Sequence, residues 1–286
     1  HTWEVLQNFK GGNAVFTQPT TPIKCGGAPQ KIMYLAEDYF RKQGIRDKTN
    51  VLYATPGTTI FGVPEFAKTL NKIIHDREII FKPFYAPVAI DAEKQEITFR
   101  YSKPGESNCT IMEGNPLGEE LVGALDIKVH FDMLHLAPPQ MAPQFIQDSK
   151  ISIQDGPGKG WIDVDIHTMQ HKRYPNIFSI GDVAHLPTAK TGAAIRKQAP
   201  VLVENLITLI EAGKVGSKSY EGYSSCPIVT GYGKMLLCEF KYDNVRDSDP
   251  LIKTFVDTTK EQYSMWLLKK YGLPFMYWNL MLRGKA

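Results

Sequence analysis

The sequence predicts an α/β fold built around a parallel β-sheet. In the first half, Val51–Thr55, Pro64–Arg77 and Ile79–Phe84 have the character of a buried strand, a helix opened by proline and a second strand. Strand, helix, strand at this length is a βαβ unit, which implies parallel strands. In the second half, the apolar run Ile177–Ile180 precedes a stretch of helical periodicity from about Gly192 to Ala212. Both halves therefore favour the same class.

Composition and residue spacing exclude several functions. Of the 286 residues, 43% are hydrophobic and 22% are charged, as in ordinary globular proteins. A net charge of +3 without a basic run argues against nucleic-acid binding. Four cysteines without a CxxC pair, and seven histidines without ligand spacing, predict neither a disulfide framework nor a metal site. No stretch reaches the roughly 18 apolar residues that would span a bilayer.

One cysteine has unusual neighbours, in the stretch TPIKCGGAPQKIMYL. Gly26 and Gly27 allow a large flat partner to approach closely, and Pro29 suits the first turn of a helix that continues through Lys42. Cys25 therefore precedes a helix N-terminus, where the peptide dipoles favour a thiolate. The alternative is an inert buried thiol, the commoner fate of cysteine.

Polar residues gather where the second predicted strand ends. Asp182 follows Ile177–Ile180 directly, and Lys190, Thr191 and Gly192 open the long helix. An acidic residue at the end of a parallel strand, beside a helix N-terminus, is typical of a ligand site in α/β sheets. The alternative is that Asp182 caps a turn. After the first-half strand, the stretch TPGTTIFG lacks G-x-G-x-x-G, which argues against a nicotinamide site there.

Three further segments complete the first half. Gln95–Tyr101 is a strand, expected in a meander laid over the βαβ unit. The irregular stretch Ser107–Val129, which holds Cys109, is expected to be an insertion or a long surface loop. DMLHLAPP is a short strand stopped by Pro138 and Pro139.

The last part of the chain predicts a hairpin and then helices. GYSSCPIVTGYGKMLLCEFKY has two strand-like runs that carry Cys226 and Cys238 and turn near Gly231–Gly233. Thr258 and Glu261 can form a capping box for a following helix, which Gly272 and Pro274 would break. Phe275–Leu282 is aromatic-rich and flanked by lysines and arginine, which is typical of an interfacial membrane anchor. The alternative is a segment packed on the core or on a dimer partner.

Taken in order, these motifs resemble the sulfide:quinone oxidoreductases of mitochondria and related bacteria. The match includes TPIKCGGAPQKIMYLAEDYFRKQG, IFGV, MLHLAPP, YPNIFSIGDVAHLPTAKTGAA, GYSSCPIVTGYGK and LPFMYWNLMLRG. The resemblance implies the FAD/NAD(P) disulfide-reductase fold, which has two dinucleotide-binding, Rossmann-like domains and a C-terminal amphipathic membrane-associated segment. Family members begin upstream, with the G-x-G-x-x-G of the first FAD half, so the chain is expected to be N-terminally truncated and its first domain incomplete.

The resemblance also implies domain boundaries. Residues 1–9 would end the first half of the FAD domain, and 10–135 would form the second dinucleotide-type domain without G-x-G-x-x-G. Residues 136–257 would form the second FAD half with the hairpin, and 258–286 the amphipathic C-terminal helices.

Residue roles carried over from the family are as follows. Cys25 would hold the persulfide beside the flavin, and Asp182 would bind FAD hydroxyls. The cofactor would also be contacted by Lys190, Thr191, Gly192, Pro138 and Pro139. Phe275, Tyr277 and Trp278 would lie in the membrane near the quinone entrance.

The implied reaction is FAD-dependent oxidation of hydrogen sulfide, with electrons passed to ubiquinone. Sulfite, glutathione or sulfide would accept the sulfur, and the implied location is the mitochondrial inner membrane, or alternatively the bacterial plasma membrane periphery. Animal members place the second redox cysteine where this chain has Val183, so the partner of Cys25 is expected to be Cys226, with Cys238 as the other candidate; Cys109 receives no role. The alternatives are an NADH:quinone oxidoreductase of the same fold and an inactive membrane-associated protein.

Overall fold

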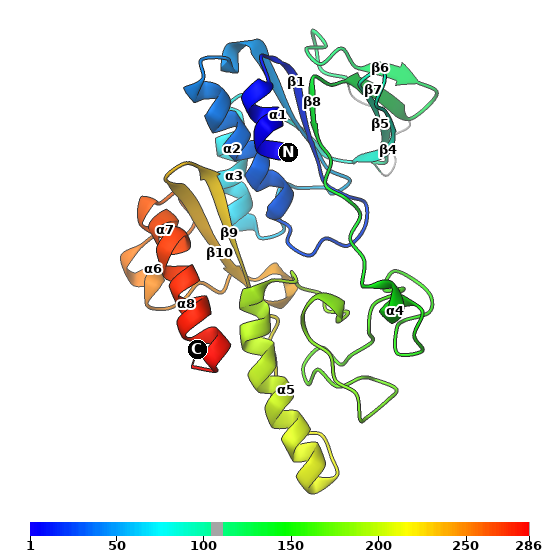
Figure 1. Ribbon diagram of the computed structural model, residues 1–286, viewed down its shortest axis with the longest axis vertical. Coiled ribbons are helices and arrows are strands. Elements are labelled where there is room, and N and C mark those ends of the chain that lie inside the picture. The colour runs from blue at the N-terminus through cyan, green and yellow to red at the C-terminus, as the bar shows by residue number, and fades with distance from the viewer. Residues whose placement is uncertain (104–110, 286) are drawn as a thin grey trace. The chain divides into compact units, whose positions relative to one another are not determined.

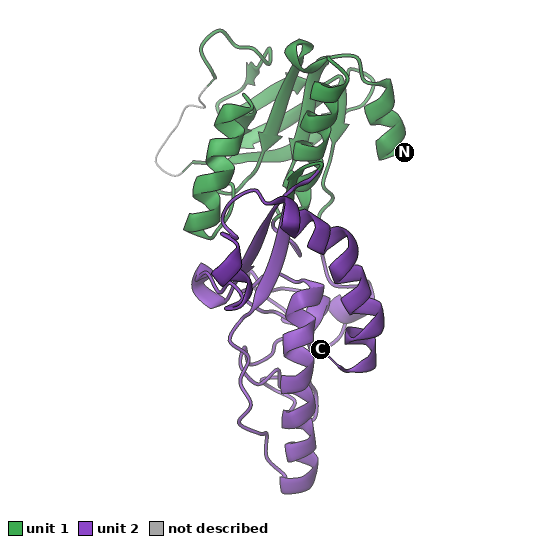
Figure 2. Ribbon diagram, turned by 90° about the vertical axis from the view of Figure 1, so that its left-hand side faces the viewer, with its two compact units in different colours: residues 1–21, 27–139, 229–232 green, residues 22–26, 140–228, 233–286 purple. Residues whose placement is uncertain are grey.

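The structure is a computed structural model that describes residues 1–103 and 111–285. They form two compact units (Figures 1 and 2). Unit 1 comprises His1–Thr21, Gly27–Pro139 and Val229–Tyr232; unit 2 comprises Pro22–Gly26, Gln140–Ile228 and Gly233–Ala286.

The helices are α1 Thr2–Asn8, α2 Ala28–Lys42, α3 Pro64–Asp76, α4 Gln144–Gln147, α5 Gly192–Ala212, α6 Ile252–Phe255, α7 Tyr263–Leu267 and α8 Leu273–Asn279. The strands are β1 Gly12–Thr17, β2 Thr49–Ala54, β3 Ile80–Lys82, β4 Tyr85–Asp91, β5 Glu96–Tyr101, β6 Glu120–Val122, β7 Asp126–His130, β8 Met133–His135, β9 Ser224–Gly231 and β10 Lys234–Phe240.

Unit 1 is built on a parallel sheet. Its strand order is β3-β2-β1-β8, and every neighbouring pair is parallel. Ala14, Val15 and Phe16 of β1 are all fully buried, as expected for a strand covered on both faces. The helix α2 packs against β1 and β2. The βαβ prediction for this part of the chain is therefore confirmed.

An antiparallel sheet packs on that parallel sheet. Its order is β4-β5-β7-β6, and Ile97, Phe99 and Tyr101 alternate inward along β5. These side chains share one hydrophobic core with Val15 and Leu52 of the parallel sheet. The predicted meander over the βαβ unit is confirmed.

Of the two alternatives expected for Ser107–Val129, an insertion or a long surface loop, the surface loop is wrong for the described part. The strands β6 and β7 lie within this stretch and pair with each other, and β7 also pairs with β5. Ile127 and Val129 alternate along β7 and pack into the shared core. The glycines before them interrupt the sequence periodicity, so the strand was not predicted. Cys109 lies outside the described residues.

Unit 2 has a core around the fully buried Trp161, and its largest helix is α5 (Figure 1). Thr191 caps α5 at its N-terminus by accepting a hydrogen bond from the Ala194 amide at 3.2 Å. Gly213 ends the helix in the left-handed conformation, with φ of 67°. The bounds of α5 are those predicted from periodicity, although Pro200 lies inside the helix.

The predicted hairpin is present as β9 and β10. Gly233 lies in the turn just before β10 and has φ of 85°, a conformation that disfavours residues with a side chain. Most of β9 and β10 is buried, and Cys226 and Cys238 lie in β9 and β10 respectively.

Three predictions for unit 2 are wrong. Ile177–Ile180 is not a buried strand: Phe178 forms only an isolated bridge with Gln170, and the described residues of unit 2 offer this run no neighbouring strand. The capping box does not form, because the Thr258 hydroxyl contacts Ser248 at 3.0 Å and α7 begins only at Tyr263. Nor does the chain break at Gly272, since a π-helical turn there continues into α8. Among the described residues, no helix has the length and apolarity needed to cross a bilayer.

Candidate functional site

Two cysteines that are 201 positions apart in the sequence meet in unit 2. The Sγ atoms of Cys25 and Cys226 are 3.0 Å apart, and one thiol donates a hydrogen bond to the other. A disulfide bond measures about 2.05 Å, so a short movement would join the two sulfurs. Cys25 is half-buried and Cys226 is fully buried in β9, so Cys25 is the more accessible sulfur.

The segment around Cys25 is fixed by its neighbour Lys24. The Lys24 amide donates to Gln140 Oε1 at 2.6 Å, and the Lys24 ammonium group pairs with Asp182 Oδ2 at 3.0 Å. On the other side, a Cβ added to Gly26 would meet no atom within 4 Å. The backbone of this segment is therefore held at Lys24 and has open space beside Gly26.

Asp182 lies in the short 3₁₀ turn Gly181–Val183. Gly181 has φ of 69°, and a Cβ there would lie 3.1 Å from Ile195, so this turn requires glycine. The Gly181 amide donates to Gln198 Oε1 at 2.9 Å, which ties the turn to α5. The Asp182 side chain is 54% exposed and can accept further hydrogen bonds.

Lys190 supplies a second positive charge. Its ammonium group donates to the Ala184 carbonyl and lies 4.8 Å from the centre of the Trp161 ring. Burial lowers the pKa of Lys190 to about 8; Asp182 opposes this shift, and the charge of Lys24 adds to it. Two cations thus share one carboxylate, and the local charge favours an anion.

The N-terminus of α5 is linked to the cysteine strand. The hydroxyls of Thr191 and Ser224 are 2.9 Å apart, and the Ser224 hydroxyl donates to the Ala189 carbonyl at 3.0 Å. Ser224 belongs to β9, two positions before Cys226. At Gly192, an added Cβ would meet no atom within 4 Å, so the first helical turn is open.

These features fit a flat anionic cofactor such as FAD. Gly26 and Gly192 leave open space where a side chain would stand. Asp182 is available to hydroxyl donors, and Lys190 and the N-terminal end of α5 favour negative charge. Lys24, Gln140 and Ser224 were not predicted from the sequence; only the position of Lys24 next to Cys25 could have indicated it.

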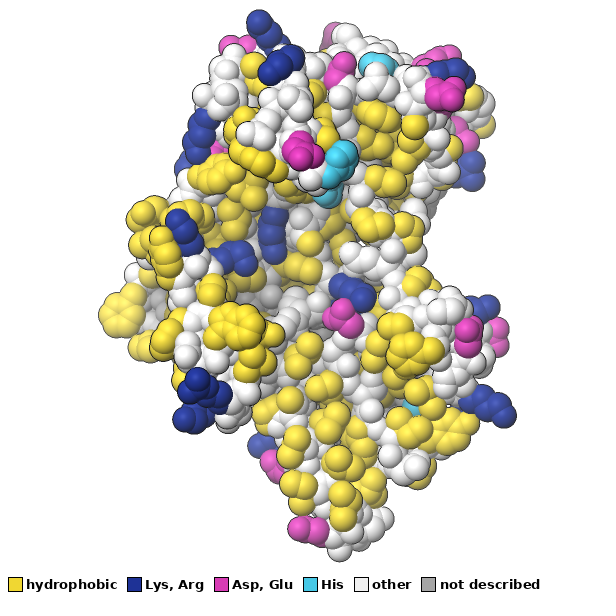
Figure 3. All heavy atoms as spheres, viewed as in Figure 1, with side chains coloured by type: hydrophobic (Ala, Val, Ile, Leu, Met, Phe, Trp, Pro, Cys, Tyr) yellow, Lys and Arg dark blue, Asp and Glu magenta, His cyan; other side chains and the backbone are white. Residues whose placement is uncertain are grey.

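The remaining predicted residues lie elsewhere. Pro138 and Pro139 are exposed at the end of unit 1, and their role beside a cofactor stays a prediction. Phe275, Tyr277 and Trp278 lie on α8 with exposed fractions of 63%, 44% and 65%. Figure 3 shows hydrophobic side chains gathered over the C-terminal helices, with lysine and arginine beside them.

Three curated proteins are similar to nearly the whole chain. The mitochondrial sulfide:quinone oxidoreductase of Mus musculus is 42% identical over 284 residues, which are 99% of this chain and 57% of that protein. The Dictyostelium discoideum protein of the same name is 39% identical, with the same coverage. The Schizosaccharomyces pombe protein of that name is 36% identical over 98% of this chain and 56% of its own length. The chain therefore spans a little over half the length of these relatives, and no family model matches it.

Two solved structures share the fold. A chain of the Tetrahymena thermophila mitochondrial ATP synthase has a TM-score of 0.72 at 19% identity, covering 96% of this chain and 60% of that one. The sulfide:quinone oxidoreductase of Aquifex aeolicus has a TM-score of 0.63 at 16% identity, covering 84% and 53%. These likenesses are of fold alone, and they confirm the predicted α/β fold class. Over nearly its whole length the chain is similar to the mitochondrial sulfide:quinone oxidoreductases, and this similarity confirms the resemblance that its motifs predicted.

Proposed function

We propose that the protein containing this chain is a sulfide:quinone oxidoreductase, in which Cys25 and Cys226 are the redox pair. The observation that carries the proposal is the 3.0 Å separation of their sulfurs, in a chain 42% identical to an enzyme of that name. Cys238 is buried in the partner strand β10 and is the weaker candidate. Because Cys226 can serve as the redox partner of Cys25, the proposed reaction does not need a cysteine at position 183, where this chain has valine.

Sulfide would enter as hydrosulfide and attack the Cys25–Cys226 disulfide. The new S–S bond forms on Cys25, because Cys25 is the more accessible sulfur, and the old bond breaks to leave Cys226 as a thiolate. Lys24 and Lys190 stabilise the negative charge that enters and is released. The products are a persulfide on Cys25 and one thiolate.

A soluble nucleophile would then remove the sulfur. Sulfite, glutathione or a second sulfide attacks the outer sulfur of the persulfide, and Cys25 leaves as a thiolate. The two thiolates would then rejoin as a disulfide, and the two electrons released in that oxidation would go to the proposed FAD, which closes the cycle.

FAD is the cofactor that we propose. Asp182 would hold its hydroxyls, and Lys190, Thr191 and Gly192 would face its ring. The chemistry that FAD supplies when bound is acceptance of two electrons and their transfer to a quinone. Pro138 and Pro139 are proposed to line the same site.

We propose that the quinone is ubiquinone and that it is reached from a membrane surface, at the mitochondrial inner membrane. Support comes from the exposed aromatic side chains Phe275, Tyr277 and Trp278 on α8 and from nearby lysines. Aromatic rings beside cations are typical of helices that lie in the membrane interface.

The test is a donor assay on the intact protein reconstituted with FAD. Sulfide plus sulfite is expected to reduce a short-chain ubiquinone, whereas NADH at the same concentration is expected to give no reduction. Reduction by NADH but not by sulfide would contradict the proposal and favour the nicotinamide-dependent alternative.

A further inference from the structure

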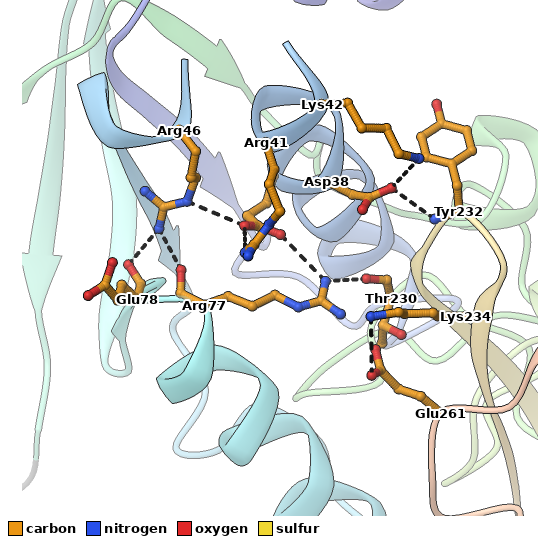
Figure 4. A network of polar contacts seen from close by, with 11 residues as sticks. Asp38, Arg41, Lys42, Arg46, Arg77, Glu78, Thr230, Tyr232, Lys234 and Glu261 are labelled. Carbon is orange, nitrogen blue, oxygen red and sulfur yellow. Dashed lines mark hydrogen bonds and ion pairs between the residues drawn. The ribbon is translucent and has the colours of Figure 1, made fainter. Parts of the chain in front are cut away.

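The tip of the hairpin that carries Cys226 is held by charged side chains of α2 (Figure 4). Asp38 Oδ2 accepts hydrogen bonds from the Tyr232 amide at 3.1 Å and from Lys42 at 2.9 Å. The Lys42 ammonium group lies 4.1 Å from the centre of the Tyr232 ring. A Cβ added to Gly231 would lie 3.5 Å from the Asp38 carboxyl carbon, so glycine permits this close approach. All four residues belong to unit 1.

A second attachment comes from Arg77, immediately after α3. Its guanidinium group donates to the Thr230 carbonyl, and one of its nitrogens lies 3.5 Å from Glu37 Oε2. Glu37 is on α2, and its side chain is only 1% exposed. Arg46 also pairs with Glu37, at 3.4 Å. A buried carboxylate needs such partners, so Glu37 fixes Arg77 against α2.

The charged groups at the tip hold Asp38 ionised. Burial alone would raise the pKa of Asp38, but hydrogen bonds from Lys42 and the Tyr232 amide, with the charges of Lys42 and Arg77, lower it overall. A charged acceptor forms stronger hydrogen bonds than a neutral one. We call Asp38, Lys42, Glu37 and Arg77 the hairpin clamp.

The two elements joined by the clamp are continuous with the two cysteine segments. The helix α2 begins at Ala28, shortly after Cys25. Strand β9 carries Cys226, and its last residues, Val229–Gly231, are part of unit 1. A two-stranded hairpin is marginally stable alone, so the attachment of its tip limits how far β9 can move.

We propose that Asp38 and Arg77 are positioning residues for the Cys25–Cys226 pair. By tying the tip of β9 to α2, they raise the effective concentration of one thiol at the other. The inference rests on the proposed function, since it assumes that the two cysteines form a redox pair. Effective concentration falls steeply when a linked group gains freedom, so the disulfide would form less readily without the clamp.

The test measures the disulfide equilibrium in the intact protein. In glutathione buffers, the two thiols lose two electrons and two protons as glutathione disulfide is reduced to two glutathione molecules. Differential alkylation and mass spectrometry of the Cys25 and Cys226 peptides give the equilibrium constant. Asp38→Asn is expected to lower this constant at least about tenfold, which raises the reduction potential of the disulfide by about 30 mV.

Asp76→Asn is the matched control. Asp76 also pairs with a lysine four positions away, Lys72, but it is on α3 and half-exposed, and none of its described contacts is to the hairpin. The control is expected to leave the constant within about twofold. Lys42→Met, at a side chain 52% exposed, tests the same clamp with little risk to folding and is expected to lower the constant several-fold.

The outcomes separate the two proposals. Suppose that the wild-type protein forms the disulfide and that neither Asp38→Asn nor Lys42→Met changes its equilibrium constant. That result would overturn the inference and leave the proposed function standing. A wild-type protein in which Cys25 and Cys226 never join would overturn both. An equal loss in Asp76→Asn would also overturn the inference, because the effect would then be general weakening.

Discussion

Replacing Cys25 by serine is expected to reduce sulfide-driven quinone reduction at least about 10³-fold, equal to about 4 kcal/mol in the barrier. A serine hydroxyl is not ionised near neutral pH and cannot form the disulfide that sulfide attacks. The sulfur of Cys226 lies 3.0 Å from that of Cys25 in the wild-type protein. In the variant it would face a hydroxyl at position 25 and could not form the disulfide. The measurement is the initial rate of quinone reduction by the intact, FAD-loaded protein.

Cys238→Ala is the control for that loss. Cys238 lies in β10 of the same hairpin and is also fully buried, so the change tests whether removal of any buried thiol disturbs the enzyme. This variant is expected to keep most of the activity. A Cys25→Ser protein with nearly full activity, or a Cys238→Ala protein as inactive as Cys25→Ser, would contradict the assignment of the redox pair.

The second large effect is expected on stability, at a buried ion pair in unit 1. Lys82 at the end of β3 lies 2.9 Å from Glu119 Oε2, and their side chains are 7% and 0% exposed. The Tyr85 hydroxyl donates to the same carboxylate at 3.2 Å. Lys82→Met would leave Glu119 as an unpaired buried charge and is expected to lower the free energy of unfolding by about 3–5 kcal/mol.

Two comparisons sharpen that prediction. Lys82→Met combined with Glu119→Gln is expected to recover much of the loss, because the buried charge is removed together with its partner. Arg100→Met breaks the more exposed bidentate pair with Asp126 in the same unit and is expected to lower the free energy of unfolding far less than Lys82→Met does, because water screens that pair. Urea unfolding followed by circular dichroism measures all three. A Lys82→Met loss no larger than that of Arg100→Met would contradict the prediction.

The local patterns in the sequence predicted much of the fold. Periodicity and proline marked α2 and α3, and Gln95–Tyr101, which contains β5, was correctly expected to be a strand of a meander. The prediction failed where structure depends on neighbours. The run Ile177–Ile180 is apolar enough for a strand, but the described residues of unit 2 give it only an isolated bridge.

The candidate site was predictable only in part. The Gly181-Asp182 turn carries a local signal, because the φ of 69° at Gly181 favours glycine, whereas Gly26 and Gly27 have no positive φ. The approach of Cys226 to Cys25 carries no such signal, since 201 positions separate them; the family resemblance supplied it. Lys24, Ser224 and the hairpin clamp depend on side-chain contacts between distant segments, which periodicity and spacing do not encode.

The central claim is that sulfide breaks a disulfide between Cys25 and Cys226 and forms a persulfide on Cys25. Its most direct test is peptide mapping of the oxidised intact protein by mass spectrometry under non-reducing conditions, before and after brief exposure to sulfide. We predict a Cys25–Cys226 linked peptide that disappears on exposure to sulfide, with one added sulfur atom on the Cys25 peptide. A linkage of Cys25 to another cysteine, or a linked peptide that sulfide leaves intact, would contradict the account.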